Sequence, residues 1–256
     1  MDLENNTKFF LFEEIVKKNF LSKYKGSVLG ILWSVLKPLL TMIVLTIIFS
    51  TIFHGAIENY PVYLLSGRCV FDYFTSANSL SMMAIRGNAN ILKRTAAPKY
   101  IFVLGGIASE FINFCITFIL LIGVMIVTHA PFHFETMFLS VIPIISLIIM
   151  ITGMGLIFSI LCSYYSDIQY IWGVISMIIM YASAIFYPID IIPEEFRQYI
   201  ILNPVLWIID QFRDFLTLGV IPNTLNIFNS LILSLIILVL GIIIFKKYEQ
   251  KATMKF

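Results

Sequence analysis

The chain contains six apolar runs, each close to or above the roughly 20 residues that a helix needs to cross the hydrocarbon core of a bilayer. They cover about 36–53, 61–84, 101–128, 137–162, 169–188 and 225–245. Of the 256 residues, 59% are hydrophobic and only 12% are charged, well below the charged fraction of a soluble domain. Such a chain cannot cover a folded core with polar surface. It is therefore predicted to be an all-α integral membrane protein with six transmembrane helices, forming one transmembrane domain over 1–256.

Lysine and arginine gather in alternate loops, which predicts the orientation of the chain. Basic residues are frequent before the first span, in 86–100 and in the tail after the last span, whereas 54–60 and 129–135 contain none. Basic residues near helix ends stay on the cytoplasmic side of the membrane. Both termini and 86–100 are therefore expected to be cytoplasmic, and the protein to be multi-pass. The segment SYYSDI (163–168) is the exception, because it should be cytoplasmic but has no basic residue.

The segment 8–23, which precedes the first span, has an amphipathic pattern. Apolar residues recur there at intervals of three and four, and the acidic and basic side chains of Glu13, Glu14, Lys17 and Lys18 face away from them. This pattern predicts a helix that lies in the membrane interface, with its apolar face buried among lipids. A solvated leader helix is the alternative.

The stretch 187–222 is too polar to span a membrane and too apolar to be a free loop. Asn203 followed by Pro204 is typical of an N-cap and a first helical residue, and an amphipathic helix should follow them. Two short helices, divided at Asn203, are predicted here. They could enter and leave the outer leaflet, surrounded by protein or a water-filled cavity, or lie flat on the outer surface.

Ionisable side chains inside apolar runs need protein or water around them. Arg68 and Asp72 lie four residues apart in the second run, beside an aromatic stripe formed by Tyr60, Tyr63, Phe71 and Phe74. This arrangement could line a path for sugar rings and phosphates, or it could be a structural ion pair with aromatic anchors. Glu110 in the third run is expected to have a partner on another helix or in a second subunit. The GMG sequence at 153–155 predicts a close helix contact.

No constellation of side chains indicates catalysis, and no GxxxxGK[ST] phosphate loop is present, so the chain is not predicted to bind a nucleotide in that manner. His129, His133 and Glu135 have a spacing that superficially resembles metal ligands, but Pro131 breaks the helix that would align them, and no metal site is predicted. No cofactor and no nucleic-acid partner are expected for this chain.

Four stretches carry a family resemblance, and they occur in the family's order: YKGSVLGILWSVLKPLLTMIVLTIIFSTIF (24–53), NYPVYLLSG (59–67), GNANILKRTAAPKYIFVLG (87–105) and YPIDIIPEEFRQYIILNPVLWIIDQFRDFL (187–216). The chain resembles the membrane subunit of polysaccharide-exporting ABC transporters of the second exporter type (ABC-2). These transporters export O-antigen, capsule or teichoic-acid polymers across the bacterial cytoplasmic (inner) membrane. The chain departs from the family at SYYSDI, where relatives often carry arginine before the aspartate. The resemblance therefore does not decide whether this chain makes a second cytoplasmic contact near Asp167.

The resemblance implies a role for each matched segment. The segment 8–23 would be the interfacial helix, and 187–222 would form external gate helices, with Tyr187, Pro188, Asn203, Pro204, Trp207 and Arg213 as gate residues. The segment 86–100 would seat in an ATPase subunit, through Asn88, Asn90, Leu92, Lys93, Arg94, Pro98 and Lys99. The substrate path would use Tyr60, Tyr63, Arg68, Phe71, Asp72 and Phe74.

The resemblance also implies the partners and the function. Two copies of this chain would work with two copies of an ATP-binding subunit, which holds the ATP and Mg²⁺, and with membrane lipids around them. The predicted function is that of a permease subunit that exports a lipid-linked polysaccharide and is not itself an enzyme. A membrane-embedded enzyme of glycan or lipid synthesis is one alternative, and a drug or lipid ABC exporter of the same fold is another.

Overall fold

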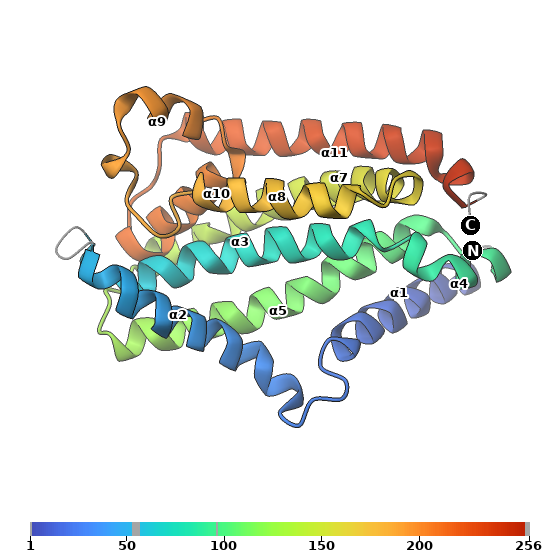
Figure 1. Cartoon of the computed structure of the whole chain (residues 1–256), viewed down its shortest axis with the longest axis horizontal. Coiled ribbons are helices and arrows are strands. Elements are labelled where there is room, and N and C mark those ends of the chain that lie inside the picture. The colour runs from blue at the N-terminus through green and yellow to red at the C-terminus, as the bar shows by residue number, and fades with distance from the viewer. Residues whose placement is uncertain (1, 53–56, 96, 254–256) are drawn as a thin grey trace.

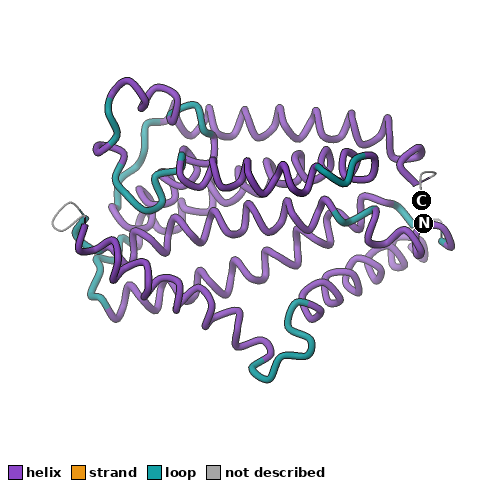
Figure 2. Tube along the Cα trace, viewed as in Figure 1, coloured by secondary structure: helices purple, strands orange, loops and turns teal. Residues whose placement is uncertain are grey.

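The protein is an all-helical bundle in the computed structural model, which describes residues 2–52, 57–95 and 97–253, and no strand occurs in these ranges (Figure 2). The helices are α1 (Asp2–Ser22), α2 (Trp33–Ile52), α3 (Tyr60–Met82), α4 (Ala89–Arg94), α5 (Lys99–Val127), α6 (Phe134–Met137), α7 (Val141–Tyr164), α8 (Ile168–Tyr181), α9 (Glu194–Ile200), α10 (Pro204–Arg213) and α11 (Thr224–Thr253). Short 3₁₀ turns precede α2, α4 and α7, and a π-helical turn, Asp214–Leu218, follows α10.

The helix α3 lies at the centre of the bundle. It packs against α5 and α7 along its length and also contacts α2, α8 and α10. Its side chains Leu64, Leu65 and Phe74 are almost wholly buried. The helix that carries Arg68 and Asp72 is therefore surrounded by other helices, which removes much of the cost of ionisable groups at membrane depth.

Four segments are long and apolar enough to cross a membrane: Gly30–Thr51, Lys99–Val127, Phe134–Tyr164 and Thr224–Lys251. Helices also occupy the other two predicted spans, but neither has both properties. The helix α3 has 23 residues but carries Arg68, Asp72 and several hydroxyl side chains. The helix α8 has 14 residues, about 21 Å of helix against a hydrocarbon core of about 30 Å. The structure therefore supports a multi-pass membrane protein with at least these four spans.

The predicted span 169–188 ends earlier than expected, because α8 stops at Tyr181. The chain then makes a turn over 182–187 in which Ala184 adopts a left-handed backbone with φ of 46°. Apolar composition continues through this turn, so hydropathy alone could not locate the end of the helix. Its cause is a set of polar side chains that bind the main-chain carbonyls of the turn, as described below.

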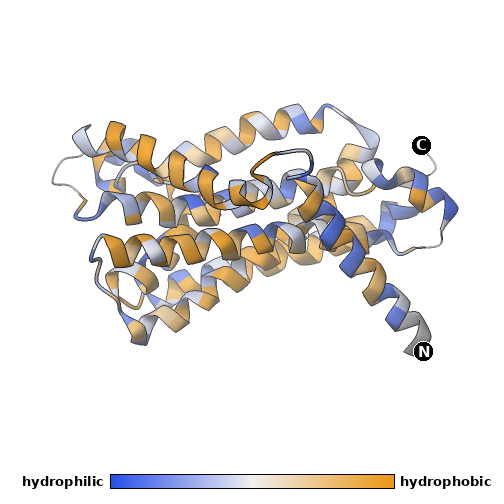
Figure 3. Cartoon of the chain, turned by 90° about the horizontal axis from the view of Figure 1, so that it is seen from below, coloured by the Kyte–Doolittle hydropathy of each residue, from blue (hydrophilic) through white to orange (hydrophobic). Residues whose placement is uncertain are grey.

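One end of the bundle collects the segments that were predicted to be cytoplasmic. The start of α1, the helix α4 and the last turns of α11 all lie at this end, and α9 lies at the other (Figure 1). The helix α1 packs against α5, where Ile15 fits over Gly105. Hydrophobic residues dominate the bundle helices, whereas hydrophilic residues concentrate at loops and along α1 (Figure 3).

The predicted close contact at the GMG sequence is confirmed. The helices α7 and α11 form the most extensive pair in the bundle. A Cβ atom on Gly153 would lie 2.5 Å from the main-chain oxygen of Ile237 in α11. Gly241 in α11 faces Gly153 in the same way, so each glycine lets the backbone of the other helix approach.

We expect Gly153→Ala to lower the stability of the purified protein by about 1–3 kcal/mol, because the added methyl forces two helix backbones apart. The thermal unfolding midpoint in detergent measures this loss. Gly123→Ala in α5 is the matched control, since nothing lies within 4 Å of the Cβ position there. Equal midpoints for the two variants would contradict a tight α7–α11 contact.

Candidate functional site

A polar cavity of about 500 Å³ lies between the loop 23–32, α2, α3 and α5. Five ionisable side chains line this polar cavity: Lys23, Lys37, Arg68, Asp72 and Glu110. The aromatic rings of Tyr24, Trp33, Tyr73 and Phe114 and several hydroxyl groups complete its wall. The lining therefore combines three cations with two carboxylates, next to rings and hydroxyls that suit polar or anionic ligands.

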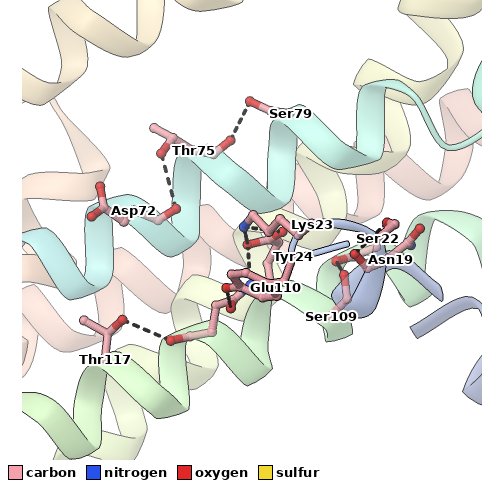
Figure 4. A network of polar contacts seen from close by, with 12 residues as sticks. Asn19, Ser22, Lys23, Tyr24, Asp72, Thr75, Ser79, Ser109, Glu110 and Thr117 are labelled. Carbon is pink, nitrogen blue, oxygen red and sulfur yellow. Dashed lines mark hydrogen bonds and ion pairs between the residues drawn. The ribbon is translucent and has the colours of Figure 1, made fainter. Parts of the chain in front are cut away.

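The loop 23–32 is tied to α5 by a polar network at one wall of the cavity (Figure 4). Lys23 Nζ donates to both carboxylate oxygens of Glu110, at 2.9 and 2.7 Å. Asn113 Nδ2 donates to Glu110 Oε2 at 3.1 Å, and the Tyr24 hydroxyl donates to Asn113 Oδ1 at 2.7 Å. Burial and the negative charge of Glu110 raise the pKa of Tyr24, so this hydroxyl stays a donor. The partner expected for Glu110 is thus Lys23, from the loop after α1.

The structure divides the predicted substrate-path residues into two groups. Arg68 and Asp72 line the polar cavity and form an ion pair of 2.8 Å within α3. The other four do not line it: Phe71 and Phe74 are buried in the core, and the hydroxyls of Tyr60 and Tyr63 bind main-chain carbonyls. The stripe therefore does not form one continuous surface of the cavity. Its role in a substrate path stays a prediction.

The turn 182–187 is held by side chains from α3 and α10. Tyr60 donates to the carbonyl of Phe186 at 2.9 Å, and Tyr63 donates to the carbonyls of Ala184 and Tyr187 at 2.7 and 2.8 Å. These hydroxyls occupy carbonyls that a continuing α8 would need for its own ladder. The turn is thus fixed from the side by α3.

Arg213 of α10 connects the turn 182–187 to α3. Its guanidinium, only 6% exposed, donates to the carbonyls of Ala184 and Tyr63, each at 3.1 Å, and lies 3.6 Å from the centre of the Tyr63 ring. A Cβ atom on Gly67 would stand 2.6 Å from Arg213 Nη2, so the glycine leaves the space that the guanidinium occupies. We call Tyr60, Tyr63, Arg213 and the turn 182–187 the α3–α10 clamp.

The two short helices in 187–222 are α9 and α10, and they are divided at Asn203. Asn203 caps α10, since its Oδ1 accepts from the main-chain nitrogen of Val205 at 3.0 Å. Its amide nitrogen donates to the Ser183 hydroxyl at 2.8 Å and so ties the cap to the turn 182–187. Of the other predicted gate residues, Tyr187 ends this turn, Pro188 follows it, Pro204 opens α10, and Trp207 is half-buried in α10. Their role as a gate stays a prediction.

The segment 86–100, expected to seat in an ATPase subunit, contains the short helix α4, which ends at Arg94. Leu92 is buried, whereas Asn90, Lys93 and Arg94 are exposed. Two contacts seat this segment on the bundle. Lys18 of α1 donates to Asn88 Oδ1 at 3.0 Å, and Lys99 donates to the Glu249 carbonyl of α11 at 2.9 Å. Pro98 stands at the N-cap of α5. The segment is thus held against α1 and α11 and exposes its basic side chains.

Comparison with known proteins identifies the family. The sequence profile of the ABC-2 type transporter family matches residues 11–217, which include the polar cavity, α4 and the α3–α10 clamp. The chain belongs to the ABC-2 type transporter family. This ABC-2 chain is 30% identical, over 95% of its length and 93% of the relative's, to the O-antigen export system permease protein RfbA of Klebsiella pneumoniae.

Two further relatives carry names of polysaccharide transport. The polysialic acid transport protein KpsM of Escherichia coli is 26% identical to this ABC-2 chain, over 87% of each protein. The capsule polysaccharide export inner-membrane protein CtrC of Neisseria meningitidis is 16% identical, over 92% of this chain and 90% of the relative. All three matches extend over most of both sequences.

Sequence reasoning missed part of the polar cavity of this ABC-2 chain. Lys23 and Lys37 were not predicted to line a cavity, and Tyr24, Tyr73 and Asn113 were not singled out. Hydrogen-bonded residues of the network around Glu110 lie up to 89 positions apart in the sequence, and no periodicity along one helix could join them. In the described ranges, no group of three histidine, cysteine or acidic residues comes together as metal ligands.

Proposed function

We propose that this chain is the transmembrane permease subunit of an ABC exporter that moves a lipid-linked polysaccharide across the bacterial cytoplasmic membrane. The observation that carries the proposal is the match to an O-antigen export permease over 95% of the chain. The polymer would be an O-antigen, a capsular polysaccharide or a teichoic-acid-like chain. Two copies of this subunit would form a homodimer and work with two copies of an ATPase subunit that binds ATP and Mg²⁺.

The proposed topology has six spans and both termini in the cytoplasm. The position of the start of α1, of α4 and of the end of α11 at one end of the bundle supports it, since each of these segments carries lysine or arginine (Figure 1). The helix α3 would cross the membrane inside the bundle, where it packs against α2, α5, α7 and α10. The short α8 would cross together with the turn 182–187.

Each segment then has a proposed task. The helix α1 would lie in the cytoplasmic membrane interface, and 86–100 would be the coupling segment on which the ATPase docks. The stretch 187–222 would form the external gate, with α9 and α10 as a re-entrant pair fixed by the α3–α10 clamp. Arg68 and Asp72 would face the substrate, because they line the polar cavity.

Export can be tested by deleting the gene in its host. We expect the surface polymer to disappear and lipid-linked polymer to accumulate inside the cell, with both restored by the wild-type gene. Proteoliposomes that contain the chain with its ATPase partner should move the lipid-linked polymer only when ATP is hydrolysed. Transport without any ATPase would refute the proposal, and so would polymer that is chemically altered but still exported in the deletion strain.

A further inference from the structure

We infer that a second, apolar pocket, beside α8, holds a hydrocarbon tail of a bilayer phospholipid. This apolar pocket has a volume of about 590 Å³ and lies between α3, α7, α8, α11 and the corner where α9 meets α10. Its half-buried and exposed lining residues include Met154, Ile157, Phe158, Ile178, Ile179 and Leu202. The inference depends only on the membrane location of the chain and not on the polymer that it exports.

The lining of the apolar pocket selects an apolar occupant. No charged side chain lines it among the described residues, and its polar side chains are Tyr199 and Asn203. The amide of Asn203 is bound within the protein, because its oxygen accepts from the main chain of Val205 and its nitrogen donates to Ala182 and Ser183. Apolar cavities stay dry and bind apolar molecules instead of water. The volume lies in the range of ordinary ligand pockets.

The depth of the apolar pocket identifies that occupant as a lipid tail. Met154 and Ile237 line the pocket from the middle of α7 and of α11, and both helices are long and apolar enough to cross a membrane. The middle of such a span lies within the hydrocarbon core of the bilayer. Ile178 and Leu202 at the pocket are 62% and 72% exposed, so the pocket opens to the outside of the bundle. Lipid tails are the solvent at this depth.

The short length of α8 gives the lipid tail a structural role. The 14 residues of α8 reach about 21 Å, less than the hydrocarbon core of about 30 Å. Ala182, directly after α8, lines the pocket, and none of the seven residues of α9 is buried, so α9 does not pack into this space. A lipid tail supplies the van der Waals contacts that a longer helix would make with α7 and α11. The tail thereby completes the packing of α8.

Native mass spectrometry of the purified full-length chain tests the inference, with palmitoyl-oleoyl phosphatidylethanolamine as the probe. We expect the wild type to retain this lipid through a detergent wash. Ile178→Trp should retain roughly fivefold less, because the indole ring takes the space of the tail and removes the packing contacts that hold a lipid against a membrane protein.

Val174→Trp is the matched control. Val174 lies one turn before Ile178 on the same face of α8 and is 57% exposed, but it does not line the apolar pocket. Both side chains are more than half exposed, so both substitutions should fit the fold and leave the thermal midpoint in detergent unchanged. We expect Val174→Trp to retain as much lipid as the wild type. Equal retention by the two variants would overturn the inference.

Two further lipids separate recognition of the tail from recognition of the headgroup. Palmitoyl-oleoyl phosphatidylglycerol should be retained as well as the phosphatidylethanolamine, because the lining carries no charge that would distinguish their headgroups. Dihexanoyl phosphatidylethanolamine has the same headgroup as the first probe but short tails, and it should not be retained. A preference for one headgroup, or retention of the short-tailed lipid, would overturn the inference.

Other occupants of the apolar pocket give different results. If Ile178→Trp separates two copies of the chain while lipid retention is unchanged, the pocket is a contact between copies. If a long-chain polyprenyl phosphate displaces the phosphatidylethanolamine at equal concentration, the pocket serves an isoprenoid carrier. Either result would overturn the inference. None of these measurements uses the ATPase or the polymer, so a failure here leaves the proposed export function untouched.

Discussion

Replacing Arg213 by alanine should destabilise the protein by about 3 kcal/mol or more and sharply lower its yield from membranes. The substitution removes the hydrogen bonds that the guanidinium donates to the carbonyls of Tyr63 and Ala184 inside the bundle, and it removes the cation stacked on the Tyr63 ring. Hydrogen bonds from a charged donor contribute about 1.5–3 kcal/mol each. The fraction that stays monodisperse after heating in detergent, followed by size-exclusion chromatography, measures the effect.

Two variants sharpen this experiment. Arg213→Lys keeps the charge but cannot donate in two directions from a planar group, so we expect an intermediate loss. Arg197→Ala is the matched control from α9. Its side chain pairs at 3.5 Å with Asp190, which is 84% exposed, and such pairs contribute about 0–1 kcal/mol. Equal losses for Arg213→Ala and Arg197→Ala would show that the α3–α10 clamp does not hold this part of the fold.

The helices of this chain follow from local signals. Uniform apolarity located α2, α5, α7 and the start of α11 within a few residues, because a helix in lipid must satisfy its own backbone along its whole apolar length. The helix α11 continues to Thr253, eight residues beyond the predicted span 225–245. The start of α10 was predicted from Asn203 and Pro204, where a side-chain oxygen takes the place of a missing main-chain acceptor. Each of these features can be recognised from residues that are close to one another in the sequence.

The end of α8 and the polar cavity depend on contacts that no local signal contains. The stop of α8 at Tyr181 depends on Tyr63, 121 positions before the carbonyl of Ala184 that it binds. A stripe of aromatic rings shows which residues share a helix face, but not whether that face meets a cavity or another helix. The sequence placed Tyr63 in this stripe but did not indicate that its hydroxyl binds a turn. Lys37 is one of many basic residues near helix ends, and only the fold shows that it lines the polar cavity.

Reversing the charge of both Lys93 and Arg94 to glutamate should abolish polymer export while the protein still inserts normally. Both side chains are exposed on α4, in the segment proposed to dock on the ATPase. Like charges placed against each other across an interface cost several kcal/mol, and about 1.4 kcal/mol already corresponds to a tenfold loss in affinity. We therefore expect at least tenfold less surface polymer, together with ATP hydrolysis that no longer responds to substrate.

The matched control reverses Lys246 and Lys247 in the last turns of α11. It removes the same charge from the same end of the bundle, next to α4 but outside 86–100 (Figure 1). If 86–100 is the coupling segment, this control keeps export and substrate-responsive hydrolysis, because α4 still presents its basic surface. The topology of every variant is checked by the accessibility of the N-terminus to protease in inside-out vesicles. An inverted or absent protein after reversal of Lys93 and Arg94 would instead make the basic segment a membrane anchor, since its charge would then be needed for insertion rather than for docking.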